Sequence, residues 1–154
     1  MMVLSEGVKA PDFELKDSEG NLHKLSDYAG QTIVVYFYPK DDTPGCTKEA
    51  CSFRDSYAEF NKAGVTIIGI SPDKVASHKK FKDKYALPFT LLADPDHKVC
   101  EAYGVWGLKK SFGREYEGVF RTTYVLGPEG EVKRVFEKVK PSDHSKEVLR
   151  EVAL

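Results

Sequence analysis

Three cysteines are the residues of this sequence with the most distinctive chemistry, and they stand at positions 46, 51 and 100. An odd number of thiols cannot pair completely within one chain, so redox chemistry, nucleophilic catalysis and metal binding are the possible functional uses. A free cysteine can also be a small apolar residue of the core. The residues around each thiol indicate which of these uses applies to it.

Cys46 stands where an apolar run, Thr32–Tyr38, and a turn-rich stretch, Asp41–Gly45, lead into an amphipathic helix. The first turn of a helix carries unpaired backbone N–H groups and the positive end of the helix dipole, and both favour a thiolate. In a parallel α/β sheet this junction lies at the carboxyl edge, where ligands usually bind. We therefore predict that Cys46 is a reactive thiol. Asp41 and Asp42 would oppose a thiolate if they were close, so reactivity requires a nearby cation.

Cys51 follows Cys46 by five residues. On a helix this spacing separates the two side chains by about 140° and the two Cα atoms by about 8–9 Å. A disulfide needs Cα atoms within about 7 Å, so the thiols cannot bond while the helix is intact. Two alternatives stay open: unrelated thiols, or a pair that bonds when this turn unwinds. Cys51 also falls off the apolar stripe, and we expect it to lie nearer to solvent.

Metal and nucleotide chemistry have little support in the sequence. Zinc sites commonly combine a close cysteine pair with a second such pair or a histidine pair, whereas His78, His97, Cys100 and His144 are widely scattered. All four histidines stand in charged segments and are expected to be solvated, which disfavours a Cys–His hydrolase. There is no glycine-rich phosphate loop. We predict neither a bound metal nor a cofactor.

The elements that would position these residues alternate between strands and helices. Apolar runs predict strands over residues 32–38, 65–70, 89–94, 120–126 and 131–137. Helical spacing predicts one helix from the Cys46 turn to Gly64, with its apolar stripe at residues 50, 53, 57 and 60, and further helices over 75–85, 96–103 and 142–154. Ser142 is the candidate N-cap of the last helix.

Turn signals complete the pattern. Runs 13–15 and 22–25 flank a turn and predict an N-terminal hairpin, while residues 104–118, with four glycines, are expected to form a loop. A βαβ unit followed by a ββα unit predicts a thioredoxin-like α/β fold, with a central mixed β-sheet flanked by helices and an N-terminal β-hairpin extension. A flavodoxin-like, all-parallel sheet is the alternative, and the hairpin signal at residues 127–130 counts against it.

Length and charge bound the possible functions. The chain has 154 residues, which fits a single domain over residues 1–154. Its 23 basic and 24 acidic residues argue against a nucleic-acid binder. The longest apolar runs have six residues, far from the roughly 20 that span a bilayer, and no export signal is evident. Together with three unpaired thiols, this indicates a cytoplasmic protein.

Residues Pro39–Cys46, PKDDTPGC, match the P-x-x-x-T-x-x-C signature of peroxiredoxins, and the chain resembles that family. The continuation TKEAC, to Cys51, is similar to the branch called bacterioferritin comigratory protein, or PrxQ. The similarity extends over nearly the whole chain and includes GVKAPDFEL from residue 7, ISPD from residue 70, DPDHKVCEAYGV from residue 94 and RTTYVL from residue 121.

The resemblance implies a thiol peroxidase that reduces hydrogen peroxide and organic hydroperoxides with cysteine alone. Cys46 would be the peroxidatic thiol, which the hydroperoxide oxidises to a sulfenic acid. Thr43 would hold the peroxide through its hydroxyl, and Pro39 would shield the pocket. Arg121 would be the cation that stabilises the thiolate and the transition state, and Glu49 would orient it. A thiolate that cleaves an O–O bond needs such fixed donors, because negative charge develops on the leaving oxygen.

The resemblance also implies how the enzyme is recycled. Cys51 would resolve the sulfenic acid as an intramolecular disulfide, and a thioredoxin-type partner would reduce that disulfide. Some PrxQ proteins carry the resolving cysteine in a later helix, which makes Cys100 the alternative, although its place beside Val99 and Tyr103 indicates a core thiol. PrxQ proteins are often monomers, and we expect a monomer here. A redox sensor and a thiol–disulfide oxidoreductase are the rival functions.

Overall fold

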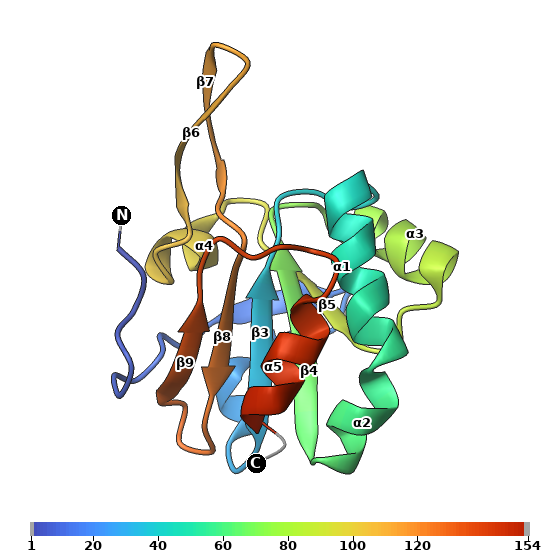
Figure 1. The fold of residues 1–154 in the computed structure, drawn as a ribbon, viewed down its shortest axis with the longest axis vertical. Coiled ribbons are helices and arrows are strands. Elements are labelled where there is room, and N and C mark those ends of the chain that lie inside the picture. Colours follow the sequence, from blue (N-terminus) through green and yellow to red (C-terminus); the bar gives the residue numbers. More distant parts are fainter. Residues whose placement is uncertain (1, 153–154) are drawn as a thin grey trace.

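The computed structural model describes residues 2–152. A seven-stranded mixed sheet forms its centre, in the order β2-β1-β5-β4-β3-β8-β9, and helices cover it (Figure 1). The strands are β1 (Glu14–Asp17), β2 (Leu22–Lys24), β3 (Thr32–Phe37), β4 (Val65–Ser71), β5 (Thr90–Ala93), β6 (Trp106–Ser111), β7 (Arg114–Val119), β8 (Thr122–Leu126) and β9 (Val132–Phe136). The helices are α1 (Pro44–Asp55), α2 (Tyr57–Lys62), α3 (Val75–Tyr85), α4 (Lys98–Ala102) and α5 (His144–Val152), with a 3-10 turn at Leu25–Tyr28.

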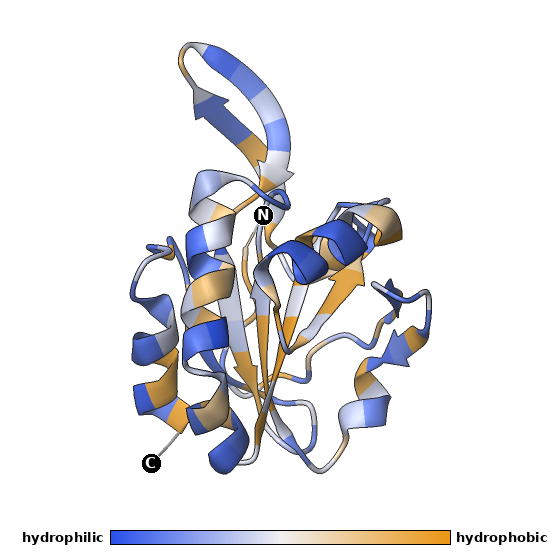
Figure 2. Ribbon diagram, turned by 90° about the vertical axis from the view of Figure 1, so that its right-hand side faces the viewer, coloured by the Kyte–Doolittle hydropathy of each residue, from blue (hydrophilic) through white to orange (hydrophobic). Residues whose placement is uncertain are grey.

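The central strands follow from their apolar runs. β3 pairs in parallel with β4 and antiparallel with β8, so it is covered by a strand on each side. Residues Ile33–Tyr38 are all buried, and Figure 2 shows the apolar strands at the centre of the molecule. The predicted βαβ and ββα units are both present, and the predicted thioredoxin-like fold with a mixed sheet is confirmed.

The two faces of the sheet carry separate apolar clusters, because successive side chains of a strand point to opposite faces. One cluster joins Val34 and Tyr36 to the helices α1, α2, α3 and α5, and it contains Cys46. The other joins Val35 and Phe37 to α4 and the N-terminal segment, and it contains Cys100. The two buried thiols therefore belong to opposite faces of the sheet.

The predicted N-terminal hairpin is confirmed. β1 and β2 pair antiparallel, with Leu15 opposite His23. β1 also pairs antiparallel with β5, with Lys16 opposite Ala93. The hairpin therefore extends the central sheet by two strands at one edge.

The single helix predicted between Cys46 and Gly64 is wrong, because the helix is interrupted at Ser56. Ser56 has φ −99° and ψ 4°, away from helical values, and separates α1 from α2. Its Oγ lies 3.2 Å from Ser145 Oγ of α5. Phe53 and Phe60 are nevertheless both fully buried, so the apolar stripe continues across the break and conceals it from the sequence pattern.

The loop predicted over residues 104–118 is also wrong. β6 and β7 form an antiparallel hairpin that projects from the body of the molecule (Figure 1). Its turn residues, Phe112 and Gly113, have φ of 50° and 76°, and positive φ at both positions is typical of a tight two-residue hairpin turn. Most side chains of the hairpin are exposed or half-buried, so it lacks the apolar alternation by which a strand is usually predicted.

The last helix begins later than predicted. α5 starts at His144, so Ser142 lies in the preceding turn and is not the N-cap. The buried His144 side chain explains this start, because it contacts Thr123 Oγ1 at 2.7 Å and Glu147 Oε1 at 2.9 Å. Residues 153 and 154 of the predicted helix lie outside the described residues. Between residues 2 and 152, no helix is long and apolar enough to cross a bilayer.

Candidate active site

Cys46 is the third residue of α1, the helix that follows β3 after the turn of residues 38–43. Pro44 opens the helix, where proline's missing N–H costs no hydrogen bond. Thr43 stands at the N-cap without a side-chain capping bond, and the first turn of α1 contains no acidic residue. The cysteine is only 1% exposed. It is therefore a shielded thiol at a helix start that has no acidic side chain in its first turn.

Arg121 supplies the cation that the sequence required. It directly precedes β8, which is antiparallel to β3, so it lies beside the carboxyl end of β3 where α1 begins. Its Nη2 donates to Cys46 Sγ at 3.1 Å, and its Nη1 donates to Glu49 Oε1 at 3.1 Å. A guanidinium in contact with the sulfur stabilises the thiolate, the nucleophilic form of cysteine.

Glu49 lies one helical turn after Cys46 and accepts a hydrogen bond from Arg121; the orienting role that the resemblance implied stays a prediction. Its side chain is 1% exposed. Burial raises the pKa of Glu49 to about 7, and the charge and hydrogen bond of Arg121 oppose this rise. Its Oε2 is buried without a hydrogen-bond partner among the described residues. The buried carboxyl group therefore binds a proton more tightly than an exposed glutamate does.

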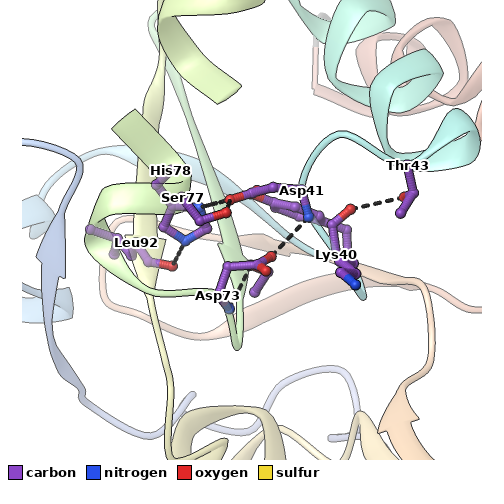
Figure 3. A network of polar contacts seen from close by, with 9 residues as sticks. Lys40, Asp41, Thr43, Asp73, Ser77, His78 and Leu92 are labelled. Atoms are coloured by element: carbon purple, nitrogen blue, oxygen red, sulfur yellow. Dashed lines mark hydrogen bonds and ion pairs between the residues drawn. The ribbon is translucent and has the colours of Figure 1, made fainter. Parts of the chain in front are cut away.

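Thr43 and Pro39 frame the turn before Cys46. Thr43 Oγ1 donates to the carbonyl of Lys40 at 2.9 Å, so in this state its hydroxyl closes the turn (Figure 3). Pro39 is half-buried and lies two residues after the end of β3. The role of Thr43 in holding a peroxide, and of Pro39 in shielding the pocket, both stay predictions.

All three cysteines are free. Cys51 is half-buried and lies in the same continuous helix as Cys46, as the spacing predicted for the reduced protein. Cys100 is fully buried on the opposite face of the sheet, which confirms its placement in the core. Burial raises the pKa of Cys100 far above its usual range, and the neighbouring Asp94 raises it further. Of the two buried thiols, Cys46 lies against the guanidinium of Arg121, whereas Cys100 lies near the carboxylate of Asp94.

Asp41 and Asp42, which would have opposed a thiolate, are bound to α3. Asp41 accepts hydrogen bonds from Ser77 and Tyr38, and its Oδ2 lies 2.8 Å from His78 Nδ1. Asp42 accepts hydrogen bonds from Lys84 and Tyr85. These contacts explain how two acidic residues can stand so near to a reactive thiol in the sequence.

The prediction that all four histidines are solvated is wrong for two of them. His78 is 0% exposed and His144 is 2% exposed. Both residues stand in charged segments of the sequence, but their side chains are buried. Burial is possible because each ring nitrogen has a hydrogen-bond partner inside the protein. Asp41, Asp73 and His78 bring three possible metal ligands within 4.8 Å of one another. Hydrogen bonds within the protein already engage these side chains, which gives no support to a metal site there.

Two further residues of the site, Gly45 and Lys109, were not predicted from their types and spacing. A Cβ at Gly45 would lie 2.7 Å from Arg121 Nη2, so only glycine leaves room for this arginine to reach the sulfur. Lys109 of β6 is a second cation near this end of the sheet: its Nζ donates to the carbonyl of Val119, two residues before Arg121, at 2.8 Å. Burial lowers the pKa of Lys109, the charge of Arg121 lowers it further, and Cys46 opposes the change. Gly45 was visible in the sequence only as a turn residue. Lys109 gave no signal, because it comes from the hairpin that was expected to be a loop.

Comparison with known proteins agrees with this geometry. Residues 7–135 match the AhpC/TSA family. The chain belongs to that family. It is 53% identical to peroxiredoxin Bcp of Bacillus subtilis over 149 residues, which cover 97% of this chain and 95% of the relative. It is 46% identical to peroxiredoxin Bcp of Escherichia coli, over 97% of this chain and 96% of the relative.

Solved structures place the chain in the same branch. Peroxiredoxin Q of Xanthomonas campestris is 41% identical and superposes with a TM-score of 0.86, over 91% of this chain and 89% of the other. A PrxQ variant from Xylella fastidiosa is 32% identical with a TM-score of 0.92, over 98% of this chain and 96% of the other. This chain is therefore a peroxiredoxin of the Bcp, or PrxQ, branch, and a thiol peroxidase. The resemblance predicted from the sequence is confirmed.

Proposed function

We propose that Cys46 reduces hydroperoxides and that Cys51 resolves the oxidised thiol. The contact of 3.1 Å between Arg121 Nη2 and Cys46 Sγ carries the proposal. It supports a thiolate at a shielded helix start, where the same guanidinium can also stabilise charge on a bound peroxide. Both inorganic and organic hydroperoxides suit this chemistry. A solved structure of the Xanthomonas campestris bacterioferritin comigratory protein, at 40% identity, concerns the alkyl peroxide reduction activity of that protein.

The first step is nucleophilic attack. The Cys46 thiolate attacks one peroxide oxygen, an S–O bond forms and the O–O bond breaks. The leaving oxygen takes up a proton and departs as water or an alcohol, and the sulfur becomes a sulfenic acid. Arg121 would stabilise the negative charge that develops on the leaving oxygen. Thr43 would turn its hydroxyl from Lys40 towards the bound peroxide, Glu49 would hold the guanidinium, and Pro39 would exclude water.

The second step joins two thiols of one helix. Cys51 as thiolate attacks the sulfenic sulfur, an S–S bond forms, and the S–O bond breaks to release hydroxide, which is protonated to water. The helix spacing places the two Cα atoms about 8–9 Å apart, beyond the reach of a disulfide. The start of α1 must therefore unwind before this bond can form. A thioredoxin-type dithiol would then reduce the disulfide by exchange and restore both thiols.

The whole cycle can run within one copy of the chain, because both thiols, Glu49 and Arg121 come from it. This supports a single domain over residues 1–154 that works as a monomer. Its three free thiols suit the reducing environment of the cytoplasm.

The test is hydroperoxide consumption by the full chain with thioredoxin, thioredoxin reductase and NADPH. We expect continuous turnover with hydrogen peroxide and with an alkyl hydroperoxide. Consumption that stops after one equivalent would indicate a sensor instead. Peptide mapping after one equivalent of peroxide, without reductant, is expected to show a Cys46–Cys51 bridge. A Cys46–Cys100 bridge, or full turnover by Cys51→Ser, would move resolution to the later helix.

A further inference from the structure

The turn that leads into α1 is tied to α3 by a buried polar network around His78 (Figure 3). His78 is 0% exposed and the Asp41 side chain is 3% exposed. Figure 3 shows Asp41 in the turn facing Ser77 and His78 of α3, while His78 also reaches Leu92 of β5. None of these side chains takes part in the chemistry proposed for Cys46.

The hydrogen count shows that His78 and Asp41 share a proton. His78 Nε2 lies 3.0 Å from the carbonyl of Leu92, which can only accept, so Nε2 carries a hydrogen. His78 Nδ1 lies 2.8 Å from Asp41 Oδ2, and this contact needs a second hydrogen between the two atoms. Tyr38 and Ser77 donate to the same carboxylate at 2.6 and 2.8 Å. The carboxylate therefore receives three hydrogen bonds, and the pair forms a charge-assisted link, the stronger kind.

The rest of the turn is tied to α3 and to the end of β4. The backbone N–H of Asp41 donates to Asp73 Oδ2 at 2.8 Å. Asp42 has a φ of 57°, which is unfavourable for a residue with a side chain. Its carboxylate is held by Lys84 Nζ at 2.8 Å and by Tyr85 OH at 2.7 Å. This turn ends at Thr43, the N-cap of the helix that carries Cys46.

We propose that His78 is a positioning residue, whose buried link to Asp41 holds the turn before Cys46 in the closed, peroxide-reactive form and so limits the rate at which α1 unwinds for disulfide formation. The proposal rests on the proposed function of Cys46 and Cys51. It concerns a competition at the sulfenic acid. Either Cys51 attacks the sulfur, as described above, or the sulfenate attacks a second hydroperoxide. In the second case an S–O bond forms, the O–O bond breaks, water or alcohol leaves, and Cys46 becomes a sulfinic acid.

Two substitutions of His78 distinguish a role in holding the turn from a role in the stability of the fold alone. In His78→Gln, the amide nitrogen can take the place of Nε2 and keep the hydrogen bond to the Leu92 carbonyl, but the hydrogen bond to Asp41 is lost. The amide nitrogen of asparagine can take the place of Nδ1 and keep the bond to Asp41, but it loses Leu92. Each variant removes one hydrogen bond from the same buried site, so a merely structural role predicts similar changes in both.

We expect His78→Gln to form the disulfide about tenfold faster than the wild type, since a hydrogen bond to a charged group can shift an opening equilibrium by this factor. It should also yield correspondingly less sulfinic acid at high peroxide and reduce peroxide more slowly in the first step. His78→Asn should stay near the wild type in both respects. Rapid acid quenching followed by mass spectrometry counts the sulfenic, disulfide and sulfinic forms of the full chain. Ile68→Val, on the opposite face of the sheet, controls for lowered stability alone.

The outcomes distinguish the two proposals. If the wild type consumes no peroxide or forms no Cys46–Cys51 bridge, the proposed function fails. If the wild type consumes peroxide and forms the bridge, the two His78 variants decide the second proposal. Equal ratios of disulfide to sulfinic acid in His78→Gln and His78→Asn, or wild-type ratios in both, would overturn the positioning role of His78. Should His78→Gln not fold, Ser77→Ala and Tyr85→Phe are the substitutes: they remove the hydrogen bonds from α3 to Asp41 and Asp42 of the same turn, and both positions are half-buried. A shift towards disulfide in these variants supports the proposal, and unchanged partition in both contradicts it.

Discussion

Cys46 and Cys100 have similar positions in their helices but neighbours of opposite charge. Each is the third residue of a helix, and the two are 1% and 0% exposed. At α4, the carboxylate of Asp94 accepts hydrogen bonds from the backbone N–H of Val99, at 3.3 Å, and of Cys100, at 2.8 Å. At α1, no acidic residue stands in the first turn, and Arg121 contacts the sulfur instead.

This difference shows that a helix start does not by itself make a reactive thiol. At α4, Asp94 already uses the N–H groups, and its negative charge adds to the effect of burial, so the pKa of Cys100 is raised strongly. At α1, the guanidinium of Arg121 contacts the sulfur, and the N–H groups of the first turn donate to no side-chain cap and stay available for an anion. The charge of one neighbouring side chain, placed by the tertiary fold, distinguishes Cys46, the proposed catalytic thiol, from the core thiol Cys100.

Removing each sulfur in turn is the largest test of this comparison. We expect Cys46→Ser to abolish peroxide turnover, because serine is not ionised at neutral pH and cannot accept the oxygen. Cys100→Ser should keep most of the activity, since that thiol only fills the core. Initial rates of peroxide consumption with thioredoxin measure both. Substantial activity in Cys46→Ser would contradict the assignment of the two thiols.

Removing the cation should make Cys46 behave more like Cys100. We expect Arg121→Ala to lower kcat/KM for peroxide by about 10²–10³-fold, the usual effect of losing a donor that stabilises transition-state charge. Alkylation of Cys46 by iodoacetamide should slow as well, because less thiolate is present. Arg114→Ala, on the projecting hairpin, is the matched control and should change neither rate. Equal alkylation rates in Arg121→Ala and the wild type would leave the arginine without a role at the sulfur.

Displacing the cation without removing it is a finer test. The Cβ of Gly45→Ala would lie 2.7 Å from Arg121 Nη2, so the guanidinium must move away. We expect kcat/KM to fall by up to about 10²-fold, which a misplacement of about 1 Å can cause. The melting temperature should not fall, because alanine favours a helix more than glycine does. Lys48→Ala, on the exposed side of the same turn, should retain the wild-type rate; if both variants matched the wild type, the close approach at Gly45 would not matter.

The hydroxyl of Thr43 should contribute less than the arginine. We expect Thr43→Val to lower kcat/KM by about tenfold, which corresponds to one hydrogen bond to the bound peroxide. Its fold should be intact, because valine has nearly the same shape. Thr47→Val, one residue beyond Cys46, is the control. Identical kinetics in Thr43→Val and wild type would make Thr43 an ordinary turn residue, as its bond to Lys40 alone would suggest.

The smallest expected effect is on stability, at Glu49. Its pKa is raised from 4.5 to about 7 in the folded protein, so the folded state holds the proton more tightly than the unfolded state. The free energy of unfolding should therefore lose a contribution as pH rises from about 4.5 to about 7. Glu49→Gln keeps an oxygen for Arg121 and removes this loss. Its melting temperature, relative to wild type, should increase between pH 5 and pH 8; a difference that does not change with pH would contradict the buried, proton-binding carboxyl.

The fold class, the helix start at Cys46 and the spacing that keeps Cys46 and Cys51 apart could all be predicted from the amino-acid sequence. These features depend on local rules: apolar runs make buried strands, helical periodicity makes α1, and five residues of helix fix a distance. The family signature then implied roles for Arg121 and Glu49. Local rules failed at two places. The hairpin β6–β7 is too polar to show the apolar alternation of a strand, and the apolar stripe of α1 and α2 continues across the helix break at Ser56.

Which charged side chain lies beside each thiol depends on the three-dimensional packing and could not be predicted from local sequence patterns. Arg121 lies 75 residues from Cys46 in the chain and reaches it because β8 pairs with β3. Asp41 stands near Cys46 in the sequence, yet α3 binds it through His78, a residue that the charged sequence placed at the surface. Electrostatic interactions depend on distance and burial in three dimensions, which neither composition nor periodicity records. The different surroundings of Cys46 and Cys100, and the reactivity proposed for Cys46, therefore follow from the packing of separate elements.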